Sequence, residues 1–412
     1  MTSRPSSRRW LMISLVFLGT AINYLDRQTL SVVAPVLIDQ FHMSNEAYSR
    51  VIFAFMLAYT IMNGVFGPLI DRLGTRVGYA LTAAWWSAAA MLHAFASGVW
   101  SLGFFRFLLG MGEAGNWPAG VKVVAEWFPT RERALASGIF NGGSAFGAIV
   151  APPLVVWIVL KTGWREAFFV VGAIGLVWAL VWSLIYHIPP EVEKEERSTT
   201  VSVRQLFRAR FVWSFTLAKI FLDPVWYFYI FWFPTYLKQA RHFDLASIGM
   251  YAWIPFMVAG LGNLLGGWLA GSLLRRNISI TVARKSGVTL FALLMLSAIP
   301  AVLTPSATSS IVLVSVAMLG YTGVTANMLA FPADVFPKSV VATIWGLASM
   351  GSGFGGMVFA LVTGWLVDRY SYVPVFIGFS LIPMIALLII WFVLGPLRPA
   401  SLPSYESATS RA

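Results

Sequence analysis

The residues best placed to do chemistry in this chain are an acid and a base that stand side by side inside an apolar stretch. Asp26 and Arg27 follow the apolar residues 11–21 and precede residues 30–38, which are also mostly apolar. Placing an ionisable side chain in hydrocarbon costs at least about 2.5 kcal/mol on insertion scales, so such residues usually have a use. We therefore expect Asp26 and Arg27 to line a polar pathway through a membrane.

A second acid and base lie in another apolar stretch, residues 99–123. Arg106 and Glu113 are seven residues apart, so in a helix they share nearly one face at a separation of about 10 Å along the axis. Glu113 and Asp26 each fall near the middle of their stretches, which places both carboxylates at comparable depth. These four groups either handle a charged ligand and a proton, or they pair with one another to tie helices together.

The elements that must position these groups are long apolar stretches. Hydrophobic residues make up 58% of the 412 residues and charged residues only 11%, a composition that excludes a water-soluble globular protein. Twelve stretches are long enough to cross about 30 Å of hydrocarbon as helices. They are residues 10–38, 48–70, 77–97, 99–123, 133–160, 164–187, 211–238, 246–273, 284–304, 308–331, 339–367 and 372–395. The sequence therefore predicts an all-α membrane protein with 12 transmembrane helices, the first of which is retained because its charges do not fit a signal peptide.

Positive charge is concentrated on one side of the predicted membrane. With the N-terminus in the cytoplasm, 19 of the 29 Lys and Arg residues fall in inside segments, 6 in outside segments and 4 within the stretches. This bias accounts for the net charge of +12 without a nucleic-acid partner, and it predicts that both termini are cytoplasmic. The sequence has no cysteine and only four scattered histidines, so we expect no disulfide, metal or other cofactor.

The chain divides into two halves that resemble each other. The hydrophilic residues 191–210 predict a cytoplasmic linker between a six-helix bundle at residues 1–190 and another at residues 211–412. Eight positions recur at a constant offset of 208, one with a different acid: Glu126, Phe128, Pro129, Ala134, Gly138, Ser144, Phe146 and Gly147 correspond to Asp334, Phe336, Pro337, Ala342, Gly346, Ser352, Phe354 and Gly355. Parallel repeats of six spans are typical of transporters whose binding site lies between the halves.

A loop after the second stretch carries a family signature. The segment Gly67-Pro68-Leu69-Ile70-Asp71-Arg72-Leu73-Gly74-Thr75-Arg76 resembles the G-x-x-x-D-R-x-G-x-R signature of the major facilitator superfamily. The resemblance implies a fold of two pseudosymmetric six-helix bundles. It also implies that Asp71, Arg72 and Arg76 act in gating, by holding the halves together at the cytoplasmic side in one state. The corresponding loop of the second half, residues 267–271, has no acid.

Further motifs narrow this resemblance to the anion:cation symporter family of sugar-acid carriers. They are Tyr24-Leu25-Asp26-Arg27, Arg106, Glu113, residues 126–133 and Asn141-Gly142-Gly143-Ser144. Residues 118–122, 151–157 and 223–226 are most similar to hexuronate transporters. The resemblance covers nearly the whole chain and implies transport of galacturonate or glucuronate.

Arg27 is the residue that we expect to bind the carboxylate of such a substrate. Its guanidinium offers a planar fork and stays charged even where it is poorly solvated. Tyr24 lies three residues earlier on the same helix face and can hydrogen-bond the carboxylate or a nearby hydroxyl. Tyr59 is similar to a tyrosine that lines the family's site, and an ordinary packing role is its alternative.

Asp26, Glu113 and Arg106 are expected to couple transport to protons. The protonation of a buried carboxylate responds both to desolvation and to a nearby arginine, and Arg106 is placed to supply the opposing charge to Glu113. A substrate that engages an arginine would weaken its hold on a carboxylate and favour proton uptake there. Neighbours on a helix do not face each other, so Asp26 and Arg27 are expected to have separate partners.

Amide and hydroxyl side chains are candidates to bind sugar hydroxyls, because a polyol presents both donors and acceptors. They are Asn116, Asn141 and Ser144 in the first half and Ser349 and Ser352 in the second. Ser144 and Ser349 stand where galactonate-type relatives carry a glutamine and an asparagine, so we do not expect galactonate specificity to carry over. Helix packing is the alternative role for each of these residues.

The seventh stretch adds a charge pair beside a proline. Lys219 and Asp223 are four residues apart and share a face, which predicts an internal ion pair near a gating helix loosened by Pro224. Trp226 and Tyr229 follow, and we expect one of them to stack on the C–H face of a sugar. Packing or a position at the membrane interface is the alternative for both.

Together the residues and the resemblance imply a multi-pass symporter of the cell inner membrane that takes up a hexuronate with protons by alternating access. One proton offsets the roughly 2.3 kcal/mol per 100 mV that opposes entry of a monoanion. The alternatives are another organic anion, such as galactonate or glucarate, and sodium in place of protons. A membrane enzyme acting on a lipid-linked sugar is remote, since the short loops hold no catalytic constellation. The expected partners are a sugar-acid anion, protons and the bilayer, and the expected state is a monomer.

Overall fold

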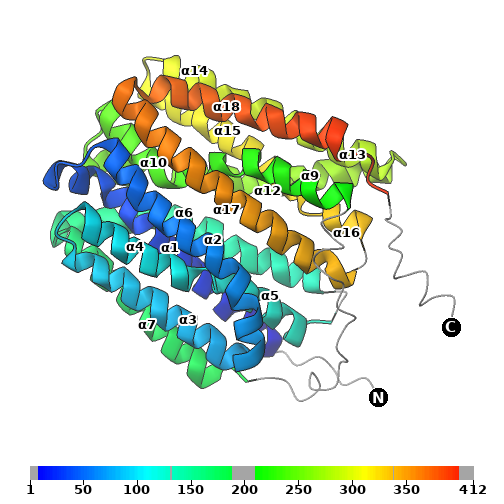
Figure 1. Cartoon of the computed structure of the whole chain (residues 1–412), viewed down its shortest axis with the longest axis horizontal. Coiled ribbons are helices and arrows are strands. Elements are labelled where there is room, and N and C mark those ends of the chain that lie inside the picture. The colour runs from blue at the N-terminus through cyan, green and yellow to red at the C-terminus, as the bar shows by residue number, and fades with distance from the viewer. Residues whose placement is uncertain (1–7, 130–131, 188–208, 337, 399–412) are drawn as a thin grey trace.

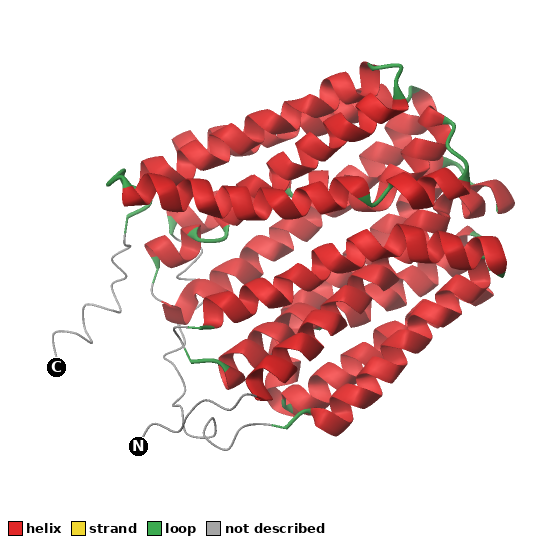
Figure 2. Cartoon of the chain, turned by 180° about the vertical axis from the view of Figure 1, so that it is seen from behind, coloured by secondary structure: helices red, strands yellow, loops and turns green. Residues whose placement is uncertain are grey.

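The computed structural model describes residues 8–129, 132–187, 209–336 and 338–398, and these ranges are helical apart from short connections and contain no strand (Figure 1, Figure 2). All twelve predicted stretches are helical. Eight helical segments of the described chain are long and apolar enough to cross a membrane by length and composition alone. The other four stretches, at residues 10–38, 77–97, 99–123 and 211–238, contain charged or polar residues or a break in the helix.

The first half of the described chain forms a bundle in which α1 packs on α6, α2 on α4 and α3 on α7 (Figure 1). A short 3₁₀ turn at His93–Phe95 follows α3. The bounds of the helices are α1 (Arg8–Gln40), α2 (Asn45–Leu73), α3 (Thr75–Leu92), α4 (Val99–Glu113), α5 (Asn116–Trp127), α6 (Arg133–Lys161) and α7 (Trp164–Ile185). The predicted linker lies almost wholly outside the described residues.

The second half forms a bundle in which α15 packs on α12 and α13, and α17 packs on α9. A 3₁₀ turn at Met295–Ser297 and a π-helical turn at Ile389–Val393 complete it. The helices are α9 (Arg210–Leu222), α10 (Pro224–Arg241), α11 (Leu245–Tyr251), α12 (Ile254–Arg275), α13 (Ile280–Leu294), α14 (Ala298–Leu303), α15 (Ala307–Met328), α16 (Phe331–Val335), α17 (Lys338–Arg369) and α18 (Tyr372–Leu388).

Two breaks between helices lie beside predicted site residues. After α4 ends at Glu113, Gly115 approaches α3 so closely that a Cβ atom would lie 2.5 Å from Thr82 Cγ2, so only glycine fits there. Pro224 is the first residue of α10, a position that suits proline because its missing N–H group is not needed in the first turn. Each break therefore leaves an ionisable residue, Glu113 or Asp223, at a helix end inside the bundle.

The two halves contact each other mainly through α2 and α17, which run antiparallel side by side (Figure 1). At one end of this pair the Asp368 carboxylate accepts hydrogen bonds from Asn45 N at 3.0 Å, Asn45 Nδ2 at 2.9 Å and Glu46 N at 2.7 Å. Farther along, a Cβ atom added to Gly353 would lie 2.1 Å from Thr60 Oγ1, so the two helices touch there. The contact between the halves is therefore close from the Asp368 end to the level of Thr60.

The other end of the α2–α17 pair is not packed in this way. A Cβ atom added to Gly64 or Gly67 of α2, or to Gly346 of α17, would meet nothing within 4 Å. Around these three glycines there is room for larger side chains, unlike at Gly353.

Candidate functional site

The centre of the first half holds a buried ion pair between α1 and α4. Arg27 Nε donates to Glu113 Oε2 at 2.8 Å, and the two side chains are only 2% and 0% exposed. Arg27 Nη2 and Glu113 Oε1 are also buried, and neither has a hydrogen-bond partner among the described residues. Because buried polar atoms are nearly always paired, this unused donor and unused acceptor mark the pair as a place where a ligand or a proton can bind.

Aromatic rings surround the Arg27 guanidinium. Its Cζ atom lies 4.8 Å from the ring centroids of both Tyr24 and Tyr59 and 5.2 Å from that of Phe55. Ring faces attract a cation at these distances, and more strongly away from water. Tyr24 and Tyr59 thus lie beside Arg27, as the sequence analysis expects, and together with Glu113 they fix the direction of the guanidinium.

Arg106 occupies a different place from the one expected. Its Nη2 donates to the backbone oxygen of Arg27 at 2.6 Å, and its Cζ lies 4.8 Å from the Phe55 ring and 5.8 Å from the Phe231 ring of α10. The direct ion pair of Glu113 is with Arg27 and not with Arg106, and the role of Arg106 in proton coupling stays a prediction. The physical reason is distance: two helical turns separate Arg106 from Glu113, whereas α1 brings Arg27 directly opposite. Arg106 remains within electrostatic reach of Glu113.

Asp26 is buried without a partner. It is 1% exposed, and neither carboxylate oxygen has a hydrogen-bond partner in the described chain. An unpaired buried charge is costly, so this carboxyl is a candidate for holding a proton. Asn23 and Gln28 of α1, which sequence reasoning did not select, are also buried with unpaired side-chain atoms. Their position within three residues of Asp26 in an apolar stretch is the signal that could have found them.

The amide and hydroxyl candidates of the first half differ in their surroundings. Asn116 is fully buried, accepts from Tyr79 Oη at 2.6 Å and donates to Thr20 Oγ1 at 3.2 Å, so it joins α1, α3 and α5 within one bundle. Asn141 and Ser144 are half-buried on α6, and Ser144 Oγ donates to the Asn141 backbone oxygen at 2.7 Å. Asn116 is therefore occupied by its own bundle, whereas the amide of Asn141 is accessible.

The candidate binding residues of the second half are two serines of α17 and Tyr229 of α10. Ser352 of α17 is buried with its Oγ 3.3 Å from Tyr227 Oη, and Ser349 is half-buried on the same helix. Tyr229 is 1% exposed and its ring packs at 5.2 Å from Phe228 and 6.3 Å from that of Phe376 on α18. Tyr229 thus packs within its own bundle, and its expected stacking on a sugar has no support in this arrangement.

The predicted charge pair of α9 is present and has a third member. Lys219 Nζ lies 2.7 Å from Asp223 Oδ2, and Tyr321 Oη of α15 donates to Asp223 Oδ1 at 3.2 Å. Trp226 stacks on Tyr321 with a centroid distance of 5.4 Å and an interplanar angle of 12°. Sequence reasoning missed Tyr321. The repeat offset of 208 applied to Glu113 leads to this residue and could have found it.

The gating residues of the family signature are only partly described. Arg76 Nε donates to the Ser183 backbone oxygen of α7 at 2.8 Å, so Arg76 binds within its own half. Arg72 is exposed. The side chain of Asp71 lies outside the described residues, and its gating role stays a prediction.

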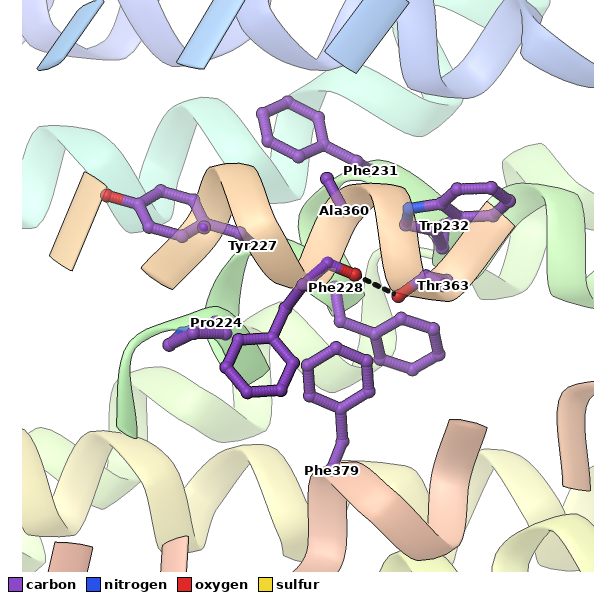
Figure 3. A pocket seen from close by; sticks show the side chains of 10 residues that line it. Pro224, Tyr227, Phe228, Phe231, Trp232, Ala360, Thr363 and Phe379 are labelled. Carbon is purple, nitrogen blue, oxygen red and sulfur yellow. Dashed lines mark hydrogen bonds between the residues drawn. The ribbon is translucent and has the colours of Figure 1, made fainter. Parts of the chain in front are cut away.

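A small cavity lies inside the second half, behind α10. Figure 3 shows Tyr227, Phe231 and Trp232 of α10 beside Thr363 of α17 and Phe379 of α18, and Thr363 Oγ1 donates to the Phe359 backbone oxygen at 2.7 Å. None of the residues that line this cavity carries a charge. It therefore cannot compensate an acid and is distinct from the Arg27–Glu113 site.

Comparison with protein families and curated proteins finds transporters. Residues 16–320 match the Major Facilitator Superfamily. The chain is 35% identical over 405 residues to a hexuronate transporter of Escherichia coli (strain K12), covering 94% of each chain. It is 39% identical over 307 residues to a galacturonate transporter of Dickeya chrysanthemi, covering 70% of this chain and 89% of that one. It is 30% identical over 427 residues to a probable galactarate/D-glucarate transporter of E. coli K12, covering 95% of each.

Among solved structures, the fold is similar to a bacterial homologue of the human lysosomal transporter Spinster in an inward-facing, occupied conformation. The TM-score is 0.71 at 19% sequence identity, with 99% of this chain and 98% of that chain covered. The prediction of an all-α protein with twelve transmembrane helices in two bundles is confirmed by this likeness. The chain is a multi-pass membrane protein that belongs to the Major Facilitator Superfamily, a family of transporters and not of enzymes.

Proposed function

We propose that the protein is a symporter that takes up a hexuronate, galacturonate or glucuronate, together with protons by alternating access. The names of the two relatives at 35% and 39% identity support this substrate class. The single observation that carries the mechanism is the Arg27–Glu113 ion pair at 2.8 Å. Arg27 is the best cation for a substrate carboxylate, and in this arrangement it is already paired with the carboxylate of Glu113.

The coupling follows from competition for Arg27. An incoming uronate carboxylate binds the guanidinium through its free Nη2 and then through Nε, and it displaces Glu113 Oε2. A Glu113 carboxylate that has lost its counter-charge in a buried site favours protonation. Substrate and proton therefore arrive together. When the proton leaves Glu113 toward the cytoplasm, the carboxylate regains Arg27 and expels the substrate.

Asp26 and Arg106 support this exchange in different ways. Asp26 has no hydrogen-bond partner among the described residues that a substrate would have to displace, so it is a second place for a proton that does not compete with the substrate. Arg106 acts as a positioning residue, because its bond to the Arg27 backbone oxygen at 2.6 Å holds α1 against α4. A second proton would let the inside-negative potential drive uptake, by about 2.3 kcal/mol per 100 mV for each net charge.

The proposed setting is the cell inner membrane with both termini cytoplasmic. The charge bias of the loops supports this orientation. The open space beside Gly64, Gly67 and Gly346, at the end of the α2–α17 pair that the loop charges assign to the cytoplasm, supports release of substrate to that side. One chain contains both bundles and the site between them, so we propose that the monomer is sufficient for transport.

Glu113→Gln in liposomes tests the coupling. The wild type should accumulate labelled galacturonate when a pH gradient, acid outside, is applied. The variant should still exchange labelled for unlabelled galacturonate but should not accumulate it, and it should bind the substrate more tightly because the competing charge is gone. Glu166→Gln, an exposed acid in the first turn of α7, is the matched control and should behave as the wild type. Unchanged pH-driven accumulation by Glu113→Gln contradicts the role of Glu113.

The same assay separates the alternatives. Counterflow with galactonate and glucarate as competitors shows whether another sugar acid is preferred, and replacing sodium by choline shows whether sodium drives uptake. Accumulation that follows sodium and ignores the pH gradient contradicts proton coupling. Preferred uptake of an aldarate contradicts the choice of a uronate.

A further inference from the structure

The second half of the molecule carries its own buried polar cluster on the helices that correspond to α1 and α4. Helices α4 and α5 together span Val99–Trp127 and α15 and α16 span Ala307–Val335, so their outer bounds coincide at an offset of 208. At this offset Glu113 corresponds to Tyr321. Both halves therefore place a polar side chain at the same point of the fourth helix, directed at the first helix of the same half.

The members of this second cluster, Lys219, Asp223 and Tyr321, are bonded to one another within one half. Asp223 binds Lys219 Nζ through Oδ2 at 2.7 Å and accepts from Tyr321 through Oδ1 at 3.2 Å. The Lys219 and Asp223 side chains are 9% and 7% exposed, and Lys219 Nζ lies 5.0 Å from the Trp345 ring centroid. Because no member bonds to the first half, the expectation that Lys219 and Asp223 act as a gate between the halves has no support in this arrangement.

Aromatic side chains connect the second cluster with the surroundings of Arg27. The Phe55 ring, whose centroid lies 5.2 Å from Arg27 Cζ, packs 5.9 Å from the ring of Phe231 on α10, and Phe231 stacks on Tyr227 at 6.3 Å. The backbone N–H of Tyr227 in turn donates to the backbone oxygen of Asp223 at 3.3 Å. A path of packed aromatic rings thus joins the two clusters across the interface between the halves.

We propose that Lys219, Asp223 and Tyr321 form the part of the site that recognises the hydroxyl groups of the sugar acid. The inference rests on the proposed function. Each sugar hydroxyl both donates and accepts. The Asp223–Lys219 pair offers an acceptor and a donor 2.7 Å apart, since each carboxylate oxygen has a second lone pair and the ammonium has two N–H groups beyond the one that Asp223 takes. Neighbouring hydroxyls can bind this pair without breaking it.

The charge of the cluster adds a selectivity. Asp223 compensates Lys219, so the second half presents no net positive charge to a ligand at this point. A neutral hydroxyl-bearing end suits such a pair, whereas a second carboxylate would meet Asp223 at close range. The cluster therefore favours a uronate, which has one carboxylate, over an aldarate, which has two.

The test measures the Kd of three ligands for the purified full chain by calorimetry: galacturonate, galactarate, and cyclohexanecarboxylate, which carries one carboxylate on a six-membered ring without hydroxyls. Tyr321→Phe should raise the Kd of galacturonate about threefold, and the double variant Lys219→Met/Asp223→Leu about thirtyfold, as hydrogen bonds to hydroxyls are lost. The Kd of cyclohexanecarboxylate should change less than about twofold in both. The double variant leaves no unpaired charge in the bundle and is expected to fold.

Asp223→Asn tests the charge argument. The substitution leaves the Lys219 charge uncompensated, which favours a ligand with a second carboxylate. The ratio of the Kd of galactarate to the Kd of galacturonate should therefore fall about tenfold. Lys285→Met is the matched control, because Lys285 is also a buried lysine of the second half. Its Nζ lies 5.3 Å from the Trp391 ring and donates to the Trp391 backbone oxygen at 3.4 Å, and neither group belongs to the cluster. Its ratios should equal those of the wild type.

Two results overturn the proposal. An equal loss for galacturonate and cyclohexanecarboxylate shows that the cluster only maintains the fold or the position of Arg27. Unchanged Kd values with lost pH-driven uptake show that it belongs to proton coupling. If the wild type binds no uronate, the proposed function fails instead. In that case the Kd values of the same variants are measured for the hydroxylated acid that the wild type does bind and for the hydroxyl-free analogue of that acid.

Discussion

The two halves of this transporter each place a buried polar cluster between their first and fourth spans, but the polar atoms of the two clusters are bonded to different extents. In the first half, Arg27, Arg106, Glu113 and Asp26 all keep buried polar atoms without a hydrogen-bond partner among the described residues. In the second half, both oxygens of Asp223 are bonded, to Lys219 and to Tyr321. A repeated architecture therefore supports one cluster that is open to new partners and one that is already complete.

This difference indicates a division of work. Unpaired buried groups are costly and are kept where a ligand or proton binds in turn. A buried ion pair whose members are both bonded can accept further hydrogen bonds, but breaking the pair is costly. We therefore assign the binding and release of the proton and of the substrate carboxylate to the first half. We assign recognition of the substrate's hydroxyl groups to the second half. The following predictions test that contrast.

Arg27→Lys should have the largest effect, because it removes the planar fork that holds both Glu113 and the substrate carboxylate. We expect kcat/KM for galacturonate uptake to fall about 100-fold or more, since an ammonium cannot bind a carboxylate through two parallel N–H groups. Arg50→Lys, in an exposed ion pair with Glu46, is the control and should be unchanged. Near-normal uptake by Arg27→Lys would break the contrast, because the first half would then not hold the carboxylate.

Asp26→Asn should reduce pH-driven accumulation about tenfold while leaving the Kd of galacturonate within about twofold, because Asp26 has no contact with Arg27 to release. Uptake with and without a pH gradient, together with calorimetry, measures the two quantities. Asp39→Asn is the control, because Asp39 is an exposed acid at the C-terminal end of α1. A large change in Kd would show that Asp26 takes part in substrate binding and not only in proton transfer.

Asp368→Asn should loosen the contact between the halves without altering either cluster. The Asp368 carboxylate now accepts hydrogen bonds from the backbone N–H groups of Asn45 and Glu46. An asparagine would place its own amide N–H group opposite one of these donors. We expect Thr60→Cys, in a chain that has no other cysteine, to react about fivefold faster with an impermeant thiol reagent added outside. Arg369→Gln in the same background is the control. Equal labelling rates would mean that the outer contact does not set the preferred arrangement.

Tyr229→Phe should have the smallest effect. The ring packs within the second half against Phe228 and Phe376, so uptake and Kd should stay within about twofold of the wild type. A tenfold loss of galacturonate binding would return Tyr229 to the site and weaken the boundary drawn here between binding and packing aromatics.

Much of the site follows from residue type and depth. Ionisable residues are so costly in an apolar helix that Asp26, Arg27, Arg106 and Glu113 stand out without any knowledge of the fold. The i,i+4 spacing of Lys219 and Asp223 likewise predicts their pairing, because the partner lies on the same helix. What the spacing could not give is which arginine meets Glu113, since that depends on how α1 packs against α4.

The polar and aromatic residues were less predictable. Asn116 and Tyr229 look like binding residues in the sequence but point into their own bundles. Tyr321 looks like an ordinary aromatic residue but contacts Asp223. Types that are common in membrane helices carry little information about the side of the helix that faces the ligand.

The sequence by itself determined the twelve spans, the repeat of two halves and the set of buried ionisable residues, because each depends on local hydropathy, spacing or residue type. The tertiary structure alone decided the partners: Arg27 with Glu113, Arg106 with a backbone oxygen, Asp223 with Tyr321, and Asp368 with the start of α2. These contacts join helices that are far apart in the chain, and packing between helices, not spacing along them, brings the atoms within reach.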